Sequence, residues 1–541
     1  MKERWLTGIN NLKRDIKEAP KPWIAAAMII LFVVFRWGKK ILGLDSLGIT
    51  TDYPAVPGMA VMMLVLSVIA LAVIFWYVLR AKEFRLDKMY LRCGLLLGAL
   101  YLFILPPLCA PDEWVHYVTA YKVSNQILGV EPLDEQGEVM VQEEEMQAND
   151  GAFPDAEQYQ YFWTHYFGKE TGDELVASGK GPNGYYMLPY LPQAIGITVA
   201  RIFNLNFATR ILFGRICNLI WAVVAISLAI RWMPFGKKIL FCVGMLPMTL
   251  HELASNSYDA WIIAFSMMFI AYCMKLAYEK ATVDRSDIAI LAVLIALLAP
   301  CKVVYAPLIG LCLLIPKEKF GDTKRWVISA TIVLGAVMVI MLLLNGRILG
   351  SYVTEDTSEH IIGWAGEPGY TISYFLEHPM EYPKIIWNTL TIGDMGLPKN
   401  YLQDMLGRVL GWLDQNLKMP QIYYTALVLL TLGHFISVDG EVKVFRRWNK
   451  LWMTVLVAAI FLLVLTSMLL SHTPISQAHV HGVQGRYFLP ILPLMALVIF
   501  KDVGLVVKKD RQKLLSAAFA VFHVLLMAQL FGQVITVHLA G

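Results

Sequence analysis

Long apolar runs recur along almost the whole chain. Runs of seventeen or more residues lie at 57–79, 91–108, 210–230, 327–344, 451–470 and 514–537. Each is long enough to cross the roughly 30 Å hydrocarbon core of a bilayer as a helix. Of all residues, 57% are hydrophobic and only 16% are charged, whereas soluble domains carry about 25% charged residues. This pattern excludes a water-soluble enzyme and predicts an all-α, polytopic bundle of transmembrane helices.

The cysteines and the net charge exclude further classes. The seven cysteines show no CxxC pair and no Cys/His spacing, which excludes a disulfide framework and a zinc site. The net charge of +4 comes from basic residues that mostly flank the apolar runs, so nucleic-acid binding has no support. The apolar run at 23–35 follows a basic N-terminus and lacks a small-residue cleavage site. We therefore expect an uncleaved first span that starts in the cytoplasm.

The distribution of basic residues predicts the orientation in the membrane, because Lys and Arg collect in cytoplasmic connections. Successive connections between spans face opposite sides of the membrane and so form two sets. One set contains 19 Lys and Arg, and the other contains 7. The first set is predicted to be cytoplasmic, and the segment 112–184, with fifteen acidic residues, to be extracytoplasmic. A span at 185–203 would reverse the side of every later connection and contradict this charge count. The segment is broken by Pro189 and Pro192, and we expect it to be an interfacial or re-entrant helix.

This reading gives about 13 spans in a bacterial cytoplasmic membrane, with the C-terminus outside. The spans are expected near 23–36, 57–79, 91–110, 210–230, 238–253, 259–277, 286–299, 303–316, 327–345, 421–437, 451–470, 487–500 and 514–537. The chain divides into a cytoplasmic tail with two extra spans (1–89), a transmembrane module (90–345) with a first outer loop (112–209), a second large outer loop (346–420) and C-terminal spans (421–541). Two amphipathic stretches of the second loop suit helices on the membrane surface, 374–390 and 401–417.

Three ionisable groups stand where an early span reaches the outer face. Asp112 and Glu113 are adjacent, and His116 follows within one helical turn, so a helix starting here places His116 on the face of both carboxylates. Such groups can take a proton or hold a divalent cation. The alternative is that Asp112 merely caps the helix.

Two further charged residues lie at the ends of apolar runs. Asp259 begins a span on the same predicted side, as a helix cap or as a site residue facing a cavity. Lys302 lies between two apolar runs, with Tyr305 one turn on, and could hold a phosphate as a compact point charge. The alternative for Lys302 is that its side chain extends to the lipid headgroups.

The segment 471–490 carries the last candidates. Gln484, Arg486 and Tyr487 lie at the outer end of a helix hairpin, and an arginine fork matches phosphate geometry. Three histidines in the same segment could suggest a metal, but no carboxylates accompany them: His472, His479 and His481. We expect Asp112, Asp259, Lys302 and Arg486 to lie within about 15 Å of one point in an outer cavity.

Several motifs resemble known families. The Asp-Glu-x-x-His at Asp112 is similar to a motif of protein O-mannosyltransferases in the GT-C superfamily of polytopic glycosyltransferases, and the Ser-Tyr-Asp ending at Asp259 looks like the second acidic motif of the oligosaccharyltransferase catalytic subunit. Roughly residues 90–500 more closely resemble the bacterial DUF2142 family, through six motifs in the same order. These are PDEWVHYVTAY, FGRICNL, LPMTLHELASNSYD, CKVVYAPLIGLCLLIP, LGWLDQNL and GVQGRYFLPILPL.

The GT-C resemblance implies transfer of a sugar from a polyprenyl-phosphate donor to a cell-surface glycan, glycopolymer or lipid-linked acceptor on the outer face, with inversion. Asp112 would be the general base, and Glu113 and His116 would orient it or bind the acceptor. Lys302 and Arg486 would neutralise the leaving phosphate. No DxD appears near Asp112, so metal dependence does not follow from the resemblance. Mg²⁺ or Mn²⁺ could still be held by Asp112, Glu113 and Asp259.

Two alternatives remain from the sequence. A transporter or flippase of lipid-linked saccharides would grip the phosphate with the same cations, but it needs a midplane site with alternating access. A polymerase or ligase of lipid-linked glycans would depend on Arg486 and the histidines and would tolerate loss of Asp112. The predicted one-sided placement of every ionisable cluster favours a glycosyltransferase.

Overall fold

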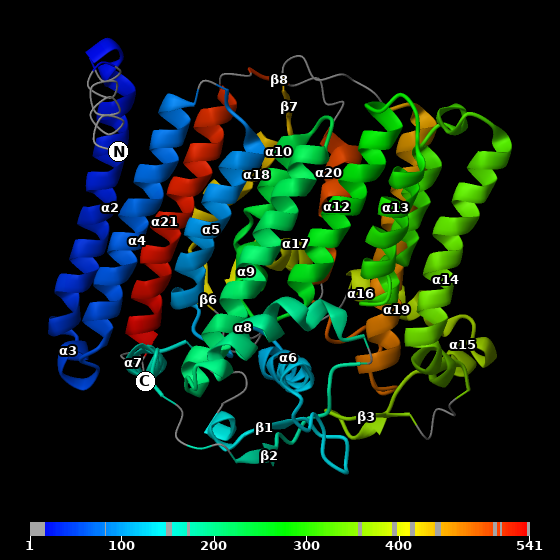
Figure 1. The fold of residues 1–541 in the computed structure, drawn as a ribbon, viewed down its shortest axis with the longest axis horizontal. Coiled ribbons are helices and arrows are strands. Elements are labelled where there is room, and N and C mark those ends of the chain that lie inside the picture. Colours follow the sequence, from blue (N-terminus) through cyan, green and yellow to red (C-terminus); the bar gives the residue numbers. More distant parts are fainter. Residues whose placement is uncertain are drawn as a thin grey trace.

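The structure, a computed structural model, is a bundle of helices with short strands at both ends (Figure 1). It describes residues 14, 17–81, 83–147, 154–169, 172, 174–184, 186–354, 360–391, 398–411, 417–438, 445–500, 506–508 and 511–537. Most of the basic N-terminus, the last four residues and the middle of the LGWLDQNL motif (412–416) lie outside the described residues.

Among the described residues, six helices are long and apolar enough to cross a membrane. They are α4 (Val56–Arg80), α9 (Phe207–Trp232), α12 (Asp259–Tyr278), α14 (Thr323–Thr354), α19 (Arg447–His472) and α21 (Arg511–Val537). Other helices of the bundle are α2 (Pro20–Ser46), α5 (Leu86–Ile104), α13 (Arg285–Leu298), α18 (Gln421–Phe435) and α20 (Leu492–Phe500). The prediction of a helical membrane protein is therefore confirmed.

Six helices among the residues described fall short of the expected count of about 13 spans, which is not confirmed. The helices α13 and α18 have only 14 and 15 residues, and three other expected spans are not single α-helices. The span expected at 238–253 divides into α10 (Lys237–Gly244) and α11 (Pro247–Leu253), because Pro247 cannot continue the first helix. The span expected at 303–316 is a 3-10 helix, η3 (Val303–Leu314), with Pro307 inside it. The third consists of η5 (Gly485–Phe488) followed by α20.

Close helix packing builds the centre of the bundle. A side chain at Gly98 of α5 would meet Leu219 of α9 at 2.5 Å, and one at Gly94 would meet Val223 at 2.9 Å. Small residues at such crossings let two helix backbones approach, which is how membrane helices gain packing contacts. The close approach of α5 and α9 places the start of α9 beside the segment that leads into the first outer loop.

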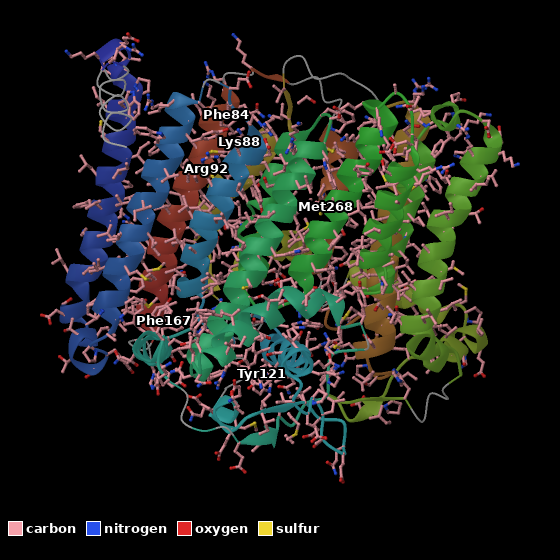
Figure 2. The ribbon with its side chains drawn as sticks, viewed as in Figure 1. Phe84, Lys88, Arg92, Tyr121, Phe167 and Met268 are labelled. Atoms are coloured by element: carbon pink, nitrogen blue, oxygen red, sulfur yellow. The ribbon has the colours of Figure 1, made fainter. Side chains whose placement is uncertain are left out.

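Both large loops have elements at the same end of the bundle, β1 (Met140–Gln142) and β2 (Leu175–Ala177) from the first and β3 (Ile361–Ile362) from the second (Figure 1). The first carries α6 (Glu113–Leu128), η1 (Glu143–Gln147), α7 (Ala156–His165) and the antiparallel pair β1 and β2. Tyr121 of α6 lies at this end, whereas Lys88 and Arg92 of α5 lie toward the other (Figure 2). Arg210 of α9 joins the loop to the bundle through ion pairs with Glu144 and Glu145, at 2.9 and 2.7 Å.

The segment expected to be interfacial or re-entrant forms η2 (Leu188–Tyr190) and α8 (Leu191–Ile202). The 12 residues of α8 extend about 18 Å, too short for a roughly 30 Å hydrocarbon core. A side chain at Gly196 would overlap the backbone carbonyl of Phe213, so α8 packs tightly on the start of α9. That this segment does not cross the membrane stays a prediction.

The second loop is more broken than expected. The stretch 374–390 divides between α15 (Ile372–Glu377) and α16 (Glu381–Thr391), on either side of Pro379. The helix expected at 401–417 ends early, as α17 (Pro398–Leu406), and is followed by the short pair β5 (Val409–Leu410) and β6 (Leu417–Lys418). Two more pairs complete the described strands, β3 (Ile361–Ile362) with β4 (Glu367–Pro368) and β7 (Ser437–Val438) with β8 (Val506–Val507). The remaining helices are α3 (Ile49–Asp52) and η4 (Lys317–Phe320).

Candidate functional site

Arg486 is the centre of the candidate site. It lies in η5, and its side chain is only 3% exposed. Its guanidinium forms ion pairs with Asp112 at 3.4 Å, Glu252 at 3.3 Å and Asp259 at 3.7 Å. A buried cation is tolerated only where such partners replace its hydration. The arginine therefore joins the N-terminal ends of α6 and α12 to α11.

Lys302 continues the same chain of ion pairs. Its ammonium lies 3.0 Å from Asp259 and over the rings of Tyr487 and Tyr258, at 4.4 and 5.2 Å from their centroids. Cation–π contacts of this kind contribute about 0.5–2 kcal/mol each. The predicted convergence of two acidic and two basic side chains on one point is thus confirmed.

Asp112 precedes α6 but does not cap it. Its φ is 60°, and its side chain makes no capping hydrogen bond. Asp and Asn tolerate this left-handed conformation better than other non-glycine residues. The carboxylate instead faces Arg486 and remains 53% exposed. The alternative that Asp112 is merely a helix cap is therefore wrong.

Asp259 does not cap its helix either. It is the first residue of α12, and its carboxylate pairs with Lys302 and Arg486. The hydroxyl of Ser257 accepts a hydrogen bond from the Asp259 backbone N–H, at 3.1 Å. Ser257 thus satisfies the backbone N–H at the start of α12. The Asp259 carboxylate is not needed for this and binds Lys302 and Arg486 instead.

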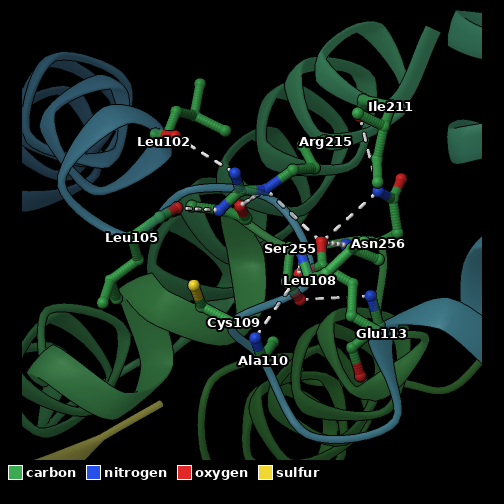
Figure 3. Close-up of polar contacts among 12 residues, drawn as sticks. Leu102, Leu105, Leu108, Cys109, Ala110, Glu113, Ile211, Arg215, Ser255 and Asn256 are labelled. Carbon is green, nitrogen blue, oxygen red and sulfur yellow. Dashed lines mark hydrogen bonds and ion pairs between the residues drawn. The ribbon is translucent and has the colours of Figure 1, made fainter. Parts of the chain in front are cut away.

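Glu113 belongs to a different, fully buried network (Figure 3). One carboxylate oxygen accepts hydrogen bonds from the backbone N–H groups of Leu108 and Ala110, at 2.8 and 3.4 Å. The other accepts from the backbone N–H of Asn256 at 2.9 Å and lies 3.4 Å from Arg215 Nε. Arg215 also donates to three backbone carbonyls, those of Leu102, Leu105 and Ala254. The network ties the chain before α6 to the chain before α12 and so positions Asp112 and Asp259, two of the three acidic residues that meet Arg486.

His116 is buried next to the ion pairs, against the rings of Tyr190 and Tyr258. Its Nδ1 is 2.9 Å from the Tyr190 hydroxyl, and its ring centroid is 4.9 Å from that of Tyr258. Burial lowers the pKa of the imidazole to about 4, although the negative charges of Asp259 and Asp112 oppose the shift. The ring is therefore neutral at pH 7 and shares a hydrogen bond with the Tyr190 hydroxyl.

The buried histidine predicts an acid-sensitive fold. An unfolded histidine has a pKa near 6.5, so below that pH the unfolded chain binds a proton that folded His116, with a pKa of about 4, does not. Its contribution to stability is complete above pH 6.5 and is lost as the pH falls toward 4, by about 2 kcal/mol between pH 7 and pH 5. His116→Gln should flatten the dependence of the apparent melting temperature on pH. His165→Gln, at an exposed histidine of α7, is the control; an unchanged slope in His116→Gln would contradict the assignment.

A cavity of about 500 Å³ opens beside Lys302, between η3 and α19. Lys302, Tyr305 and Tyr487 line one end, and apolar residues of α19 such as Leu463 and Leu470 line the wall. The Tyr305 hydroxyl donates to the Tyr487 carbonyl at 2.7 Å, so Tyr305 fixes the chain beside the site. Gln484, directly before η5, is partly exposed. A charged end and an apolar wall are suited to a lipid that carries a phosphate.

The comparisons with known proteins agree with this architecture. The model of the family DUF2142, described as a predicted membrane protein, matches residues 95–495. The chain belongs to this family. The matched region of this DUF2142 protein contains the complete ion-pair site, whereas α2, α4 and α21 lie outside it. No curated protein and no solved structure matches the chain.

The carboxylates of the DUF2142 protein do not fit the metal site considered from the sequence. Both oxygens of Glu113 are occupied by backbone N–H groups and Arg215, away from Asp112 and Asp259, which share Arg486 instead. Within the described part of the chain, no three His, Cys, Asp or Glu residues gather as metal ligands. His472 and His481 instead flank the ring of Trp364, with centroids 5.6 and 5.2 Å away.

Sequence reasoning missed Glu252 and Arg215. Glu252 is fully buried in α11 and pairs with Arg486. Its signal was a carboxylate within an apolar run, which is costly unless it is paired. Arg215 lies in α9 and pairs with Glu113, and it could have been found by the same argument. In this DUF2142 protein, Glu252 is a third carboxylate on Arg486, and Arg215 neutralises Glu113 in the neighbouring buried network.

Proposed function

We propose that this protein is a GT-C type glycosyltransferase that moves a sugar from a polyprenyl-phosphate donor to a glycan, glycopolymer or lipid-linked acceptor. One observation carries the proposal: the half-exposed carboxylate of Asp112 pairs with Arg486, Asp259 joins Arg486 to Lys302, and Lys302 lines a neighbouring cavity that is largely apolar. In the predicted orientation the site faces the outside of a bacterial cytoplasmic membrane, from which both lipid and acceptor can reach it.

In the proposed reaction, Asp112 takes the proton of the acceptor hydroxyl as its oxygen attacks the anomeric carbon. The bond from that carbon to the phosphate oxygen breaks, its electron pair stays on the polyprenyl phosphate, and the configuration inverts. Lys302 and Arg486 stabilise the charge that develops on the leaving phosphate. A positioned base of this kind contributes about 10²–10⁴-fold to the rate.

The ion pairs suggest how donor binding prepares the base. Arg486 Nε is buried and makes no hydrogen bond with any described residue, although it lies 3.7 Å from a carboxylate oxygen of Asp259. Of the three carboxylates on Arg486, only Asp112 is half-exposed; Glu252 and Asp259 are buried. A donor phosphate would therefore displace Asp112 most easily. Once freed from the arginine, the Asp112 carboxylate can accept a hydrogen bond from the acceptor hydroxyl.

The one-sided site separates this proposal from a flippase, which moves its lipid between two leaflets. In detergent micelles there is only one compartment, so a flippase forms no product. We expect the purified protein, given polyprenyl-phosphate sugar and a mixture of cell-surface acceptors, to release free polyprenyl phosphate in micelles. Intact donor in micelles, together with donor translocation in vesicles, would establish the flippase instead.

Lys302→Ala should weaken donor binding. The substitution removes a charge-assisted contact to phosphate worth about 1.5–3 kcal/mol, which is roughly ten- to a hundred-fold in affinity. Binding of a non-hydrolysable donor analogue by the purified protein measures this, and the preference among acceptors should stay the same. Lys384→Ala is the control, because Lys384 lies in α16 and pairs with the exposed Glu381. Equal donor affinity in Lys302→Ala and wild type would mean that this lysine only contacts lipid headgroups.

A further inference from the structure

A second pocket, of about 220 Å³, lies between α2 and α21. Both helices are outside the matched region 95–495, and they lie near each other at one edge of the bundle (Figure 1). Lys39 and Lys40 of α2 line the pocket, together with apolar side chains of both helices, which are Leu44, Leu47, Phe531 and Ile535. The pocket is therefore cationic at one side and apolar at the other.

A glycine of α21 makes room for one of these lysines. A side chain at Gly532 would run into the ammonium of Lys40, so the lysine lies directly over the α21 backbone. The neighbouring rings of Trp37 and Phe531 pack with centroids 5.4 Å apart and fix the two helices at this level. Lys40 is consequently only partly exposed, whereas Lys39 is exposed.

The two ammonium groups have no negative partner among the described residues. None of the residues that line the pocket is acidic, and no described carboxylate forms an ion pair with Lys39 or Lys40. Paired cations next to apolar surface attract anionic lipid headgroups, at about 1 kcal/mol per charge. The charge and the apolar wall together match a phospholipid rather than a soluble anion.

Membrane orientation does not explain these cations. The lysines lie near the end of α2 that leads into α3, which is the end of the bundle that carries the candidate site (Figure 1). The connections that are predicted to be cytoplasmic hold 19 Lys and Arg, and α2 is predicted to start on their side of the membrane and to end on the other. Two adjacent lysines on the sparsely basic side therefore point to a specific role.

We propose that this pocket binds one anionic phospholipid, with the phosphate on Lys39 and Lys40 and the start of an acyl chain against the partly exposed Leu47. The lipid would bridge α2 to α21 and so hold the outermost helix on the bundle. This inference is independent of the proposed glycosyltransferase activity, because the pocket lies apart from Arg486 and uses none of its partners.

Native mass spectrometry of the full-length protein tests the site. With mixed micelles of phosphatidylglycerol and phosphatidylcholine, wild type should retain one phosphatidylglycerol molecule. A Lys39→Gln, Lys40→Gln double variant should retain it at least about ten-fold less. Gly532→Ala should also weaken retention, because the new methyl group displaces the Lys40 ammonium. Gly38→Ala is the matched control, since a side chain at Gly38 meets open space.

Each outcome decides the proposal. Equal retention of phosphatidylglycerol by the double glutamine variant would overturn it, provided that the melting temperature shows the variant to be folded. Equal retention of phosphatidylcholine by wild type would mean an ordinary boundary lipid, which also overturns it. If inorganic phosphate alone protects the protein against heat through the same lysines, and phosphatidylglycerol adds nothing, the ligand is a free anion and the lipid assignment is wrong.

Discussion

Asp112→Asn should lower sugar transfer by about 10²–10⁴-fold, the usual cost of losing a general base. The fold should survive, because asparagine tolerates the left-handed backbone at φ 60° and no capping hydrogen bond is lost. The rate of transfer in proteoliposomes and the apparent melting temperature measure both halves of this prediction. Asp112→Ala is less informative, since alanine adds backbone strain at this position.

Asp155→Asn is the matched control for the base. Asp155 lies in the same outer loop and is a true N-cap, because its side chain accepts from the backbone N–H of Gln158 at 2.8 Å. Asparagine caps a helix as well as aspartate does, so Asp155→Asn should keep both transfer and stability. Near-normal transfer by Asp112→Asn would remove Asp112 from the reaction.

Arg486→Ala should have the largest combined effect on stability and binding. It leaves Glu252 and Asp259 in the buried part of the site without the arginine, and breaking buried ion pairs in this way costs about 3–5 kcal/mol. Donor affinity should also fall by roughly ten- to a hundred-fold. The melting temperature and the binding of a donor analogue measure the two effects separately.

A double variant separates the structural and functional roles of the arginine. Arg486→Met with Glu252→Gln removes one buried carboxylate charge along with the cation, so stability should partly recover while donor binding stays weak. Arg486→Lys should restore donor affinity only in part, since lysine lacks the planar fork. Full donor affinity in the Arg486→Met, Glu252→Gln variant would show that Arg486 has no part in phosphate binding.

Length and apolarity predicted the long helices, because crossing a bilayer requires both. They could not predict the interruption at η3, whose residues are as apolar as those of a span. A side chain at Gly310 would meet Leu456 and Trp452 of α19, so the path of η3 depends on a neighbour about 140 residues away. The break between α10 and α11 was readable from Pro247, whose ring cannot continue a helix.

The site was predictable where a charge stands at the end of an apolar run. Asp112, Asp259, Lys302 and Arg486 each show this signal, which marks groups that need a partner or a cavity. The sequence did not predict that Asp112 and Glu113 have different partners. Two adjacent carboxylates look equivalent in sequence, and only the left-handed backbone at Asp112 turns one toward Arg486 and the other into the Arg215 network.

The release of polyprenyl phosphate from a polyprenyl-phosphate sugar is the most direct test of the central claim. Wild type, Asp112→Asn and Asp155→Asn are reconstituted side by side in vesicles with donor and acceptor, and free polyprenyl phosphate is measured over time. We expect release by wild type and Asp155→Asn, and a rate lower by about 10²–10⁴-fold for Asp112→Asn. Release that is absent from wild type, or equal in Asp112→Asn, would contradict a glycosyltransferase in which Asp112 is the base.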